Sequence, residues 1–249
     1  MLDLGTSFIA SVERDPNALA IVDGATRLTY AEWYRSISSV VAALDEIGLK
    51  PGDHLLTAAQ NRWQAATIHW ACQFAGIIIT PVNWRATADE LDFLIENADG
   101  RAVVYEDATA EAVAQSKAAQ SRPRIALGKA QSGDTPWSTL HGQHAADAAP
   151  RVGPDAWSVM LYTSGTTARP KGVPRRQSVE RAAALAHVAQ NKYGNGERTL
   201  GVMPLYHTMG VRSLLAMSLI GGAFICLSRF DVLRALELIA AEKITNLYL

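Results

Sequence analysis

Residues 54–84 have the sequence HLLTAAQNRWQAATIHWACQFAGIIITPVNW, and their pattern predicts a strand, a helix and a second strand. The apolar run His54–Ala58 predicts the first strand, and Gly76 separates a helix-like half from the β-branched run of residues 77–80. Two strands that are joined by a crossover helix run parallel in a sheet. This stretch therefore predicts an α/β protein with a largely parallel sheet.

The same stretch could be mistaken for a membrane span, because residues 63–84 contain no Asp, Glu, Lys or Arg. A membrane helix needs about 20 consecutive apolar residues. Here Gln64, His69, Gln73 and Pro81 interrupt the run, which favours a buried helix followed by a buried strand. A later apolar run, residues 213–228, contains two glycines and is too short to span a membrane.

Helices and strands alternate on both sides of this stretch. Thr29-Tyr-Ala-Glu32 and Thr87-Ala-Asp-Glu90 each form a capping box that predicts the start of a helix, and Gly48 ends the first of these helices. The remaining predicted elements are strands at 101–105, 124–127, 157–162, 199–202, 223–227 and 244–249, and helices at 108–119, near 178–192, near 211–219 and after Asp231. Residues 129–154 break the alternation and predict a surface excursion.

Composition excludes several classes of protein. The chain has 249 residues, a formal net charge of -1 and 49% hydrophobic residues, which argues against a nucleic-acid coat protein and against global disorder. The two cysteines, Cys72 and Cys226, lie in apolar stretches, as structural thiols do, and exclude a disulfide scaffold. Residues 1–15 lack the pattern of a secretory signal, so we expect a cytoplasmic protein. The last residues form an apolar strand, which predicts a fragment of a longer chain. The alternative is a natural chain whose last strand is central or covered.

The densest chemical pattern is YTSGTTARPKG at residues 162–172, directly after a predicted strand. It combines the hydroxyl groups of four Ser and Thr residues, a glycine that permits close approach of the backbone, Gly165, and two cations, Arg169 and Lys171. Phosphate recognition needs such donors and positive charge with little side-chain bulk. The alternative is an ordinary Ser/Thr-rich surface turn. A Walker loop needs the pattern GxxxxGK followed by Ser or Thr, whereas here Lys171 precedes Gly172. This order argues against a P-loop kinase or GTPase.

The extended segment YTSGTTARPKGV resembles the phosphate-loop motif of the adenylate-forming enzymes, a superfamily of acyl-CoA synthetases, luciferases and peptide-synthetase adenylation domains. MPLYHTMG at residues 203–210 is similar to the Pro-Leu-x-His-x-x-Gly segment of that superfamily, and Leu28-Thr-Tyr-Ala-Glu32, Gly52-Asp53 and Asn61 also resemble its members. The resemblance covers all 249 residues. Ala168 departs from it, since the family usually has glycine there, and Gln177 stands where many relatives have histidine.

The resemblance implies an α/β fold of layered, largely parallel sheets with helices between them. It implies a ligase that joins a small carboxylic acid to ATP as an acyl adenylate and then forms a thioester with coenzyme A. The phosphates of ATP would be bound by Thr163, Ser164, Gly165, Thr166, Thr167 and Lys171, with Thr167 at Mg²⁺. His207 and Lys171 would be the catalytic residues, and Tyr206, His207, Met209 and Gly210 would line the acyl pocket. The alternative for His207 is an ordinary core histidine.

By the same resemblance, residues 1–249 form part of an N-terminal AMP-binding domain whose C-terminal lid domain is absent, and we expect no adenylation by the chain alone. The MPLYHTMG segment and the Arg229-Phe-Asp-Val run favour benzoate-like or alicyclic acids, while fatty acids, malonate and amino acids stay open. Two other functions also stay open: a peptide-synthetase-type adenylation domain, and a shortened binding protein without catalysis. A homodimer is one alternative for the assembly, and neither a nucleic-acid partner nor a membrane span is expected.

Overall fold

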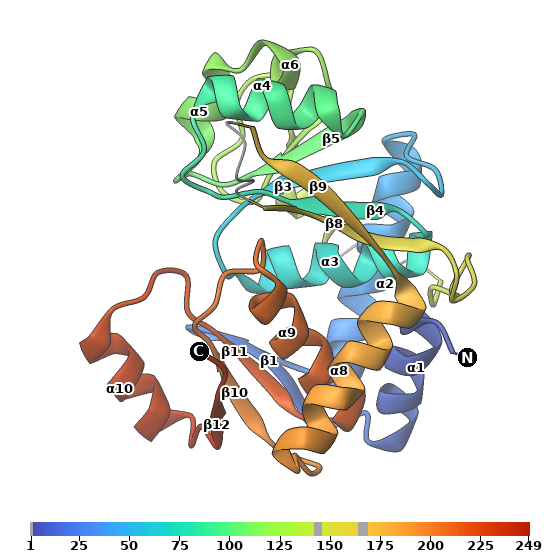
Figure 1. The fold of residues 1–249 in the computed structure, drawn as a ribbon, viewed down its shortest axis with the longest axis vertical. Coiled ribbons are helices and arrows are strands. Elements are labelled where there is room, and N and C mark those ends of the chain that lie inside the picture. The colour runs from blue at the N-terminus through green and yellow to red at the C-terminus, as the bar shows by residue number, and fades with distance from the viewer. Residues whose placement is uncertain (1, 142–145, 164–168) are drawn as a thin grey trace.

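The computed structural model describes residues 2–141, 146–163 and 169–249, which form two β-sheets with helices between and outside them (Figure 1). The larger sheet has seven strands in the order β7-β6-β5-β3-β4-β8-β9. Its strands are β3 (His54–Ala58), β4 (Ile78–Pro81), β5 (Gly100–Tyr105), β6 (Arg124–Ala126), β7 (Thr135–Pro136), β8 (Trp157–Thr163) and β9 (Lys171–Arg176). All neighbouring strands are parallel except β8 and β9.

The smaller sheet has five strands in the order β12-β10-β11-β1-β2. Its strands are β1 (Leu19–Asp23), β2 (Thr26–Thr29), β10 (Arg198–Gly201), β11 (Ala223–Cys226) and β12 (Asn246–Leu247). Only the hairpin β1–β2 is antiparallel. The prediction of layered, largely parallel sheets is confirmed.

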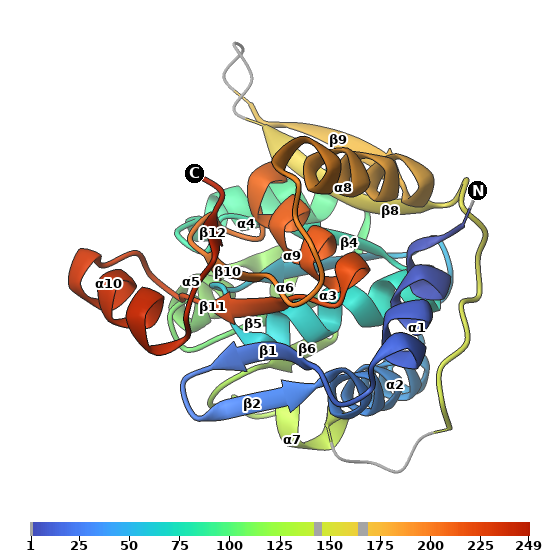
Figure 2. The same ribbon diagram turned by 90° about the horizontal axis from the view of Figure 1, so that it is seen from below.

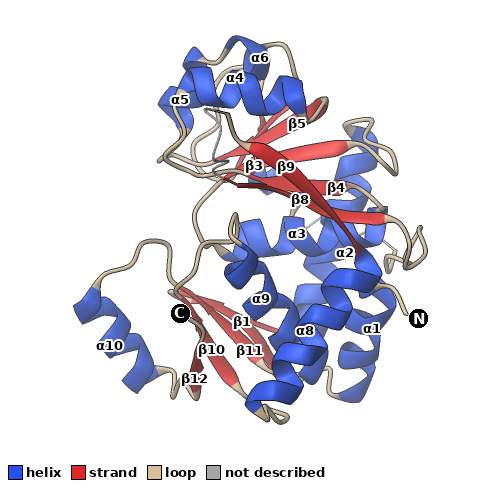
Figure 3. Cartoon of the chain, viewed as in Figure 1, coloured by secondary structure: helices blue, strands red, loops and turns tan. Residues whose placement is uncertain are grey.

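The helices divide into an inner and an outer set (Figures 1 and 3). They are α1 (Leu4–Arg14), α2 (Tyr30–Glu46), α3 (Trp63–Ala75), α4 (Ala88–Asn97), α5 (Ala110–Gln115), α6 (Lys117–Gln120), α7 (Trp137–Leu140), α8 (Gln177–Asn191), α9 (Thr208–Ile220) and α10 (Val232–Ala241). Successive side chains of β3 point to opposite faces of the larger sheet, which explains the division. Leu55 packs in the inner core with residues of α1, α2, α3 and α9. Leu56 packs in the outer core with residues of α4, α5 and α6.

The segment of residues 54–84 folds as predicted, with β3 and β4 parallel and α3 between them in sequence. All residues of α3 from Ala65 to Ala75 are buried, which explains why it carries no charged side chain. Gly76 ends the helix in the left-handed conformation, with φ +73°. Within the described part of the chain, no helix is long and apolar enough to cross a membrane.

Several local predictions are also confirmed. Both capping boxes form, at Thr29 with Glu32 and at Thr87 with Glu90. Cys72 and Cys226 are buried free thiols, and burial raises the pKa of Cys72 well above its usual range.

Other segments differ from the prediction. The helix α1 and the hairpin β1–β2 precede α2, in a part of the chain where no element was predicted. The segment of residues 108–119 forms two short helices, because Ser116 ends α5 and caps α6 through its side chain. The predicted strand of residues 244–249 is reduced to β12. Residues 129–154 include β7 and α7, and Leu140 in α7 is fully buried.

Candidate active site

The phosphate-loop segment begins at the end of β8 and runs into β9. Thr163, the last residue of β8, pairs with Lys171, the first residue of β9, so the two ends of the segment are held side by side in an antiparallel ladder. Both residues are exposed. Four predicted phosphate-binding residues, Ser164, Gly165, Thr166 and Thr167, lie outside the described residues, as does Ala168.

Helix α4 contacts both flanks of this segment. The Tyr162 hydroxyl donates a hydrogen bond to Asn97 Oδ1 at 2.7 Å, and burial raises the pKa of Tyr162. On the other flank, the Arg169 guanidinium lies 5.5 Å from the centre of the Phe93 ring, in cation–π range. One helix therefore contacts the chain both where it enters and where it leaves the candidate phosphate loop.

Asn61 lies just beyond β3 and positions the backbone of the MPLYHTMG segment, residues 203–210. Its amide nitrogen donates to the carbonyl oxygens of Gly201 and Met203 at 2.7 and 2.8 Å, and its Oδ1 accepts the backbone N–H of Leu205 at 2.9 Å. The Asn61 side chain is buried. This amide fixes the loop between β10 and α9, and its role was not predicted beyond the family resemblance.

Gly210 allows the same loop to pack closely on the helix that follows it. A Cβ atom at this position would lie 2.1 Å from the carbonyl oxygen of Pro204. The space beside Gly210 is therefore filled by backbone, and any larger residue would displace the loop that carries His207.

His207 caps the start of α9. Its Nδ1 accepts the backbone N–H of Met209 at 3.4 Å, and the side chain is exposed, unlike an ordinary core histidine. A neutral imidazole that accepts at Nδ1 carries its proton on Nε2. The Nε2–H group is thus available as a donor to an acid bound next to the helix.

A cavity of about 890 Å³ joins the two segments. Its wall includes Thr163 and Arg169 from the phosphate-loop segment and Tyr206, His207 and Thr208 from the start of α9. Apolar side chains, among them Phe93, Leu94 and Leu161, form another part of the wall. The described wall does not include Lys171, Met209 or Gly210. The cavity lies beyond the carboxyl ends of β4 and β8, where parallel α/β sheets commonly bind ligands.

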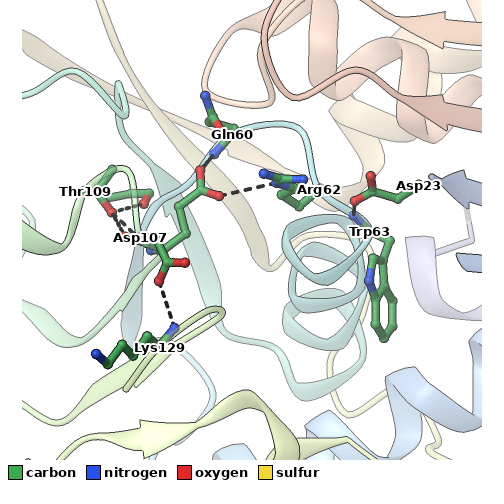
Figure 4. Close-up of polar contacts among 9 residues, drawn as sticks. Asp23, Gln60, Arg62, Trp63, Asp107, Thr109 and Lys129 are labelled. Carbon is green, nitrogen blue, oxygen red and sulfur yellow. Dashed lines mark hydrogen bonds and ion pairs between the residues drawn. The ribbon is translucent and has the colours of Figure 1, made fainter. Parts of the chain in front are cut away.

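A second cavity, of about 450 Å³, lies beyond the carboxyl ends of β3, β5 and β6 (Figure 4). Three carboxylates line it, and each accepts a backbone N–H of another segment of the chain: Glu106 from Gln60, Asp107 from Lys129, and Asp23 from Trp63 at the start of α3. These hydrogen bonds give the three carboxylates a structural role, because each one anchors a neighbouring segment of backbone. In the described ranges, no cluster of three or more His, Cys, Asp or Glu side chains could hold a metal ion.

Comparison with known proteins assigns the fold to a family. A family model described as AMP-binding enzyme matches residues 8–249. The chain belongs to this family. Relatives that match the chain include proteins named as a feruloyl-CoA synthase and as a long-chain-fatty-acid–CoA ligase.

The chain is 27% identical over 246 residues to a feruloyl-CoA synthase of Amycolatopsis sp, covering 98% of this chain and 48% of the relative. It is 25% identical over 234 residues to a 2-succinylbenzoate–CoA ligase of Bacillus licheniformis, covering 94% of this chain and 46% of the relative. The chain thus spans about half the length of these curated relatives.

Solved structures share the fold. A putative long-chain-fatty-acid CoA ligase from Rhodopseudomonas palustris superposes with a TM-score of 0.88 at 24% identity, covering 98% of this chain and 62% of that chain. Apo MatB from the same species superposes with a TM-score of 0.86 at 26% identity, covering 99% of this chain and 49% of that chain.

Proposed function

We propose that a protein containing this chain activates a small carboxylic acid with ATP to an acyl adenylate and then transfers the acyl group to the thiol of coenzyme A. The observation that carries the proposal is the 890 Å³ cavity, because its wall combines one end of the phosphate-loop segment, at Thr163, with the His207 turn. Adenylation needs this proximity, since the carboxylate must approach the α-phosphorus of ATP in line with the leaving pyrophosphate.

Specific residues fit these roles. Lys171 would place a positive charge next to the β and γ phosphates, together with the hydroxyl and backbone groups of residues 163–167. His207 would donate its Nε2–H to the acid, and Tyr206 would shape the pocket beside it. Mg²⁺ usually binds through substrate phosphates and water, with few protein ligands, and it would offset phosphate charge when bound at Thr167.

We also propose that the acid is aromatic or alicyclic. Two relatives are named for aromatic acids, feruloyl and 2-succinylbenzoate, and the apolar wall at Phe93, Leu94 and Leu161 suits a ring. Malonate, fatty acids and amino acids are the competing substrates, because relatives named for fatty acids match as well.

One relative favours a different thiol acceptor. The chain is 32% identical over 171 residues to a fatty acid–[acyl-carrier-protein] ligase of Streptomyces coeruleorubidus, covering 31% of that relative. A carrier protein in place of coenzyme A is therefore the second candidate. A thioester assay that offers both acceptors separates the two.

The proposed context of the chain has three parts. Residues 1–249 would be the first half of the large domain of a cytoplasmic enzyme, and adenylation would need the half that follows in the relatives. A homodimer is supported by the exposed apolar side chains Val232, Leu233 and Leu236 on α10, and sedimentation of a Leu233→Lys variant would test it.

The function is tested by ATP/pyrophosphate exchange with benzoate, cyclohexanecarboxylate, a medium-chain fatty acid, malonate and an amino acid. The 249-residue chain and a chain extended to the length of the relatives are assayed in parallel. Exchange by the extended chain with benzoate or cyclohexanecarboxylate supports the proposal. Exchange by the short chain would contradict the need for the second half, and no exchange by either would favour a binding protein without catalysis.

A further inference from the structure

Arg175 connects the candidate phosphate loop to the start of α9. It lies in β9, four positions after Lys171, so that the two side chains project from the same face of the strand. Thr208, the first residue of α9, lies next to His207 and lines the 890 Å³ cavity.

The Arg175 guanidinium bonds in two directions at once. Its Nη2 donates to Thr208 Oγ1 at 2.8 Å, and its Nη1 lies 3.2 Å from Glu180 Oε1 in an ion pair. The Glu180 side chain is only 4% exposed and belongs to the first turn of α8, while that of Arg175 is 22% exposed. Figures 1 and 2 show α8 and α9 side by side, and in Figure 1 both helices lie below β8 and β9.

This geometry restricts the guanidinium. A planar guanidinium that is paired with a buried carboxylate has a fixed direction for its remaining N–H groups. One of those groups points at Thr208, so the ion pair to α8 sets the position of the first residue of α9. The position of His207 follows, because His207 precedes Thr208 and bonds to the same helical turn through the Met209 N–H.

We infer that Arg175 is a positioning residue that holds the His207–Thr208 turn against β9 and so fixes His207 relative to Lys171. The inference rests on the proposed function, because it assigns His207 to the acid and Lys171 to the phosphates. It goes beyond that function by giving a role to a side chain that the motifs do not include.

Arg176 provides a matched control. It is the neighbouring arginine of β9, but its guanidinium lies 4.8 Å from the centre of the Trp157 ring and donates to the Asp155 carbonyl oxygen. Arg176→Met therefore removes the same charge and leaves the bond to Thr208 intact.

The test is amide hydrogen exchange, measured by NMR on the 249-residue chain at Met209 and Val211, whose N–H groups bond to His207. Thr208→Val removes the bond and keeps the ion pair of Arg175 with Glu180, so this variant stays informative if Arg175→Met fails to fold. We expect Thr208→Val and Arg175→Met each to exchange about tenfold faster at these amides, as for loss of one charge-assisted hydrogen bond. The double variant should exchange no faster than either single variant.

Thr208→Ser keeps the hydroxyl group and should restore the exchange rate of the parent chain, and Arg176→Met should leave the rate unchanged. Unchanged exchange in a folded Thr208→Val variant would overturn the inference. So would an equal acceleration at the amides of α3, because it would show a general loss of stability.

A titration with benzoate, followed at the His207 imidazole, separates this inference from the proposed function. A response in the parent chain that weakens in Thr208→Val and persists in Thr208→Ser supports the positioning role, and an equal response in all three variants contradicts it. If no acid in the panel affects His207 in the parent chain, the proposed substrate role fails while hydrogen exchange still decides whether Arg175 holds the turn.

Discussion

At the scale of single residues, Lys171 should contribute directly to nucleotide affinity. It is exposed at the end of the candidate phosphate loop and pairs with Thr163 across the ladder. Loss of a charge-assisted contact costs about 1.5 to 3 kcal/mol, so Lys171→Met should weaken MgATP binding roughly 10- to 150-fold. Isothermal titration calorimetry of the 249-residue chain measures this directly.

Lys129 is the control for that experiment. Its backbone N–H bonds to Asp107, and its side chain points away from the network drawn in Figure 4. Lys129→Met should therefore leave the affinity for MgATP nearly unchanged. An equal loss in both variants would mean that overall charge, and not a phosphate site at Lys171, governs binding.

Some single residues could be predicted from the sequence and others could not. The capping threonines Thr29 and Thr87 could, because their partners lie three residues away in the chain. The hydrogen bonds of the Asn61 side chain could not be predicted, because their partners Gly201, Met203 and Leu205 are distant in the sequence and lie near Asn61 only in the folded chain. The spacing of apolar residues in the sequence reflects how each helix or strand packs. A buried amide whose hydrogen-bond partners are distant in the chain produces no such spacing.

The same contrast holds for the elements of the fold. Strands with continuous apolar runs, such as β3 and β5, were predicted because both of their faces are buried. Strand β9 was missed, because it is an exposed edge strand with the sequence KGVPRR and its Pro174 is tolerated only at such an edge. Elements whose partners lie on one side only carry a weaker pattern than elements of the core.

The junction between α3 and β4 depends on Gly76. Alanine would have to adopt φ +73° there, and its Cβ would lie 2.5 Å from Val152 Cγ1. The left-handed conformation costs about 1 to 2 kcal/mol, and the steric overlap adds to this cost, so Gly76→Ala should lower the free energy of unfolding by about 2 to 4 kcal/mol. Urea denaturation monitored by circular dichroism gives the value.

A Gly48→Ala variant separates the backbone cost of Gly76→Ala from its steric cost. Gly48 follows α2 with φ +93°, and a Cβ atom at this position would have no neighbour within 4 Å among the described residues, so Gly48→Ala carries only the backbone cost. Combining Gly76→Ala with Val152→Ala should recover part of the lost stability. If Gly76→Ala and Gly48→Ala lower the free energy of unfolding equally, the steric overlap with Val152 does not contribute to the destabilisation.

At the scale of the whole molecule, α3 lies in the core between the two sheets. Its contacts reach α1, α2, β1 and β4, which belong to both halves of the fold (Figure 1). His69 lies in the middle of this helix, is 1% exposed, and has no hydrogen-bond partner for Nε2 among the described residues. Protonation of His69 would bury a positive charge in the core between the two sheets. It should therefore destabilise both sheets together.

The pH dependence of folding should report this histidine. Burial lowers the pKa of His69 from 6.5 to about 4, so between these values the unfolded chain binds a proton that the folded chain does not. Stability from this group is therefore complete above pH 6.5 and declines as the pH falls toward 4, by about 3 kcal/mol in total. Burial also lowers the pKa values of His54 and His187, which adds to the slope in the same direction. Urea denaturation from pH 7 to pH 4 should therefore show a shallower decline in His69→Leu than in the parent chain, and parallel curves would show that His69 is not the group that couples protonation to the shared core.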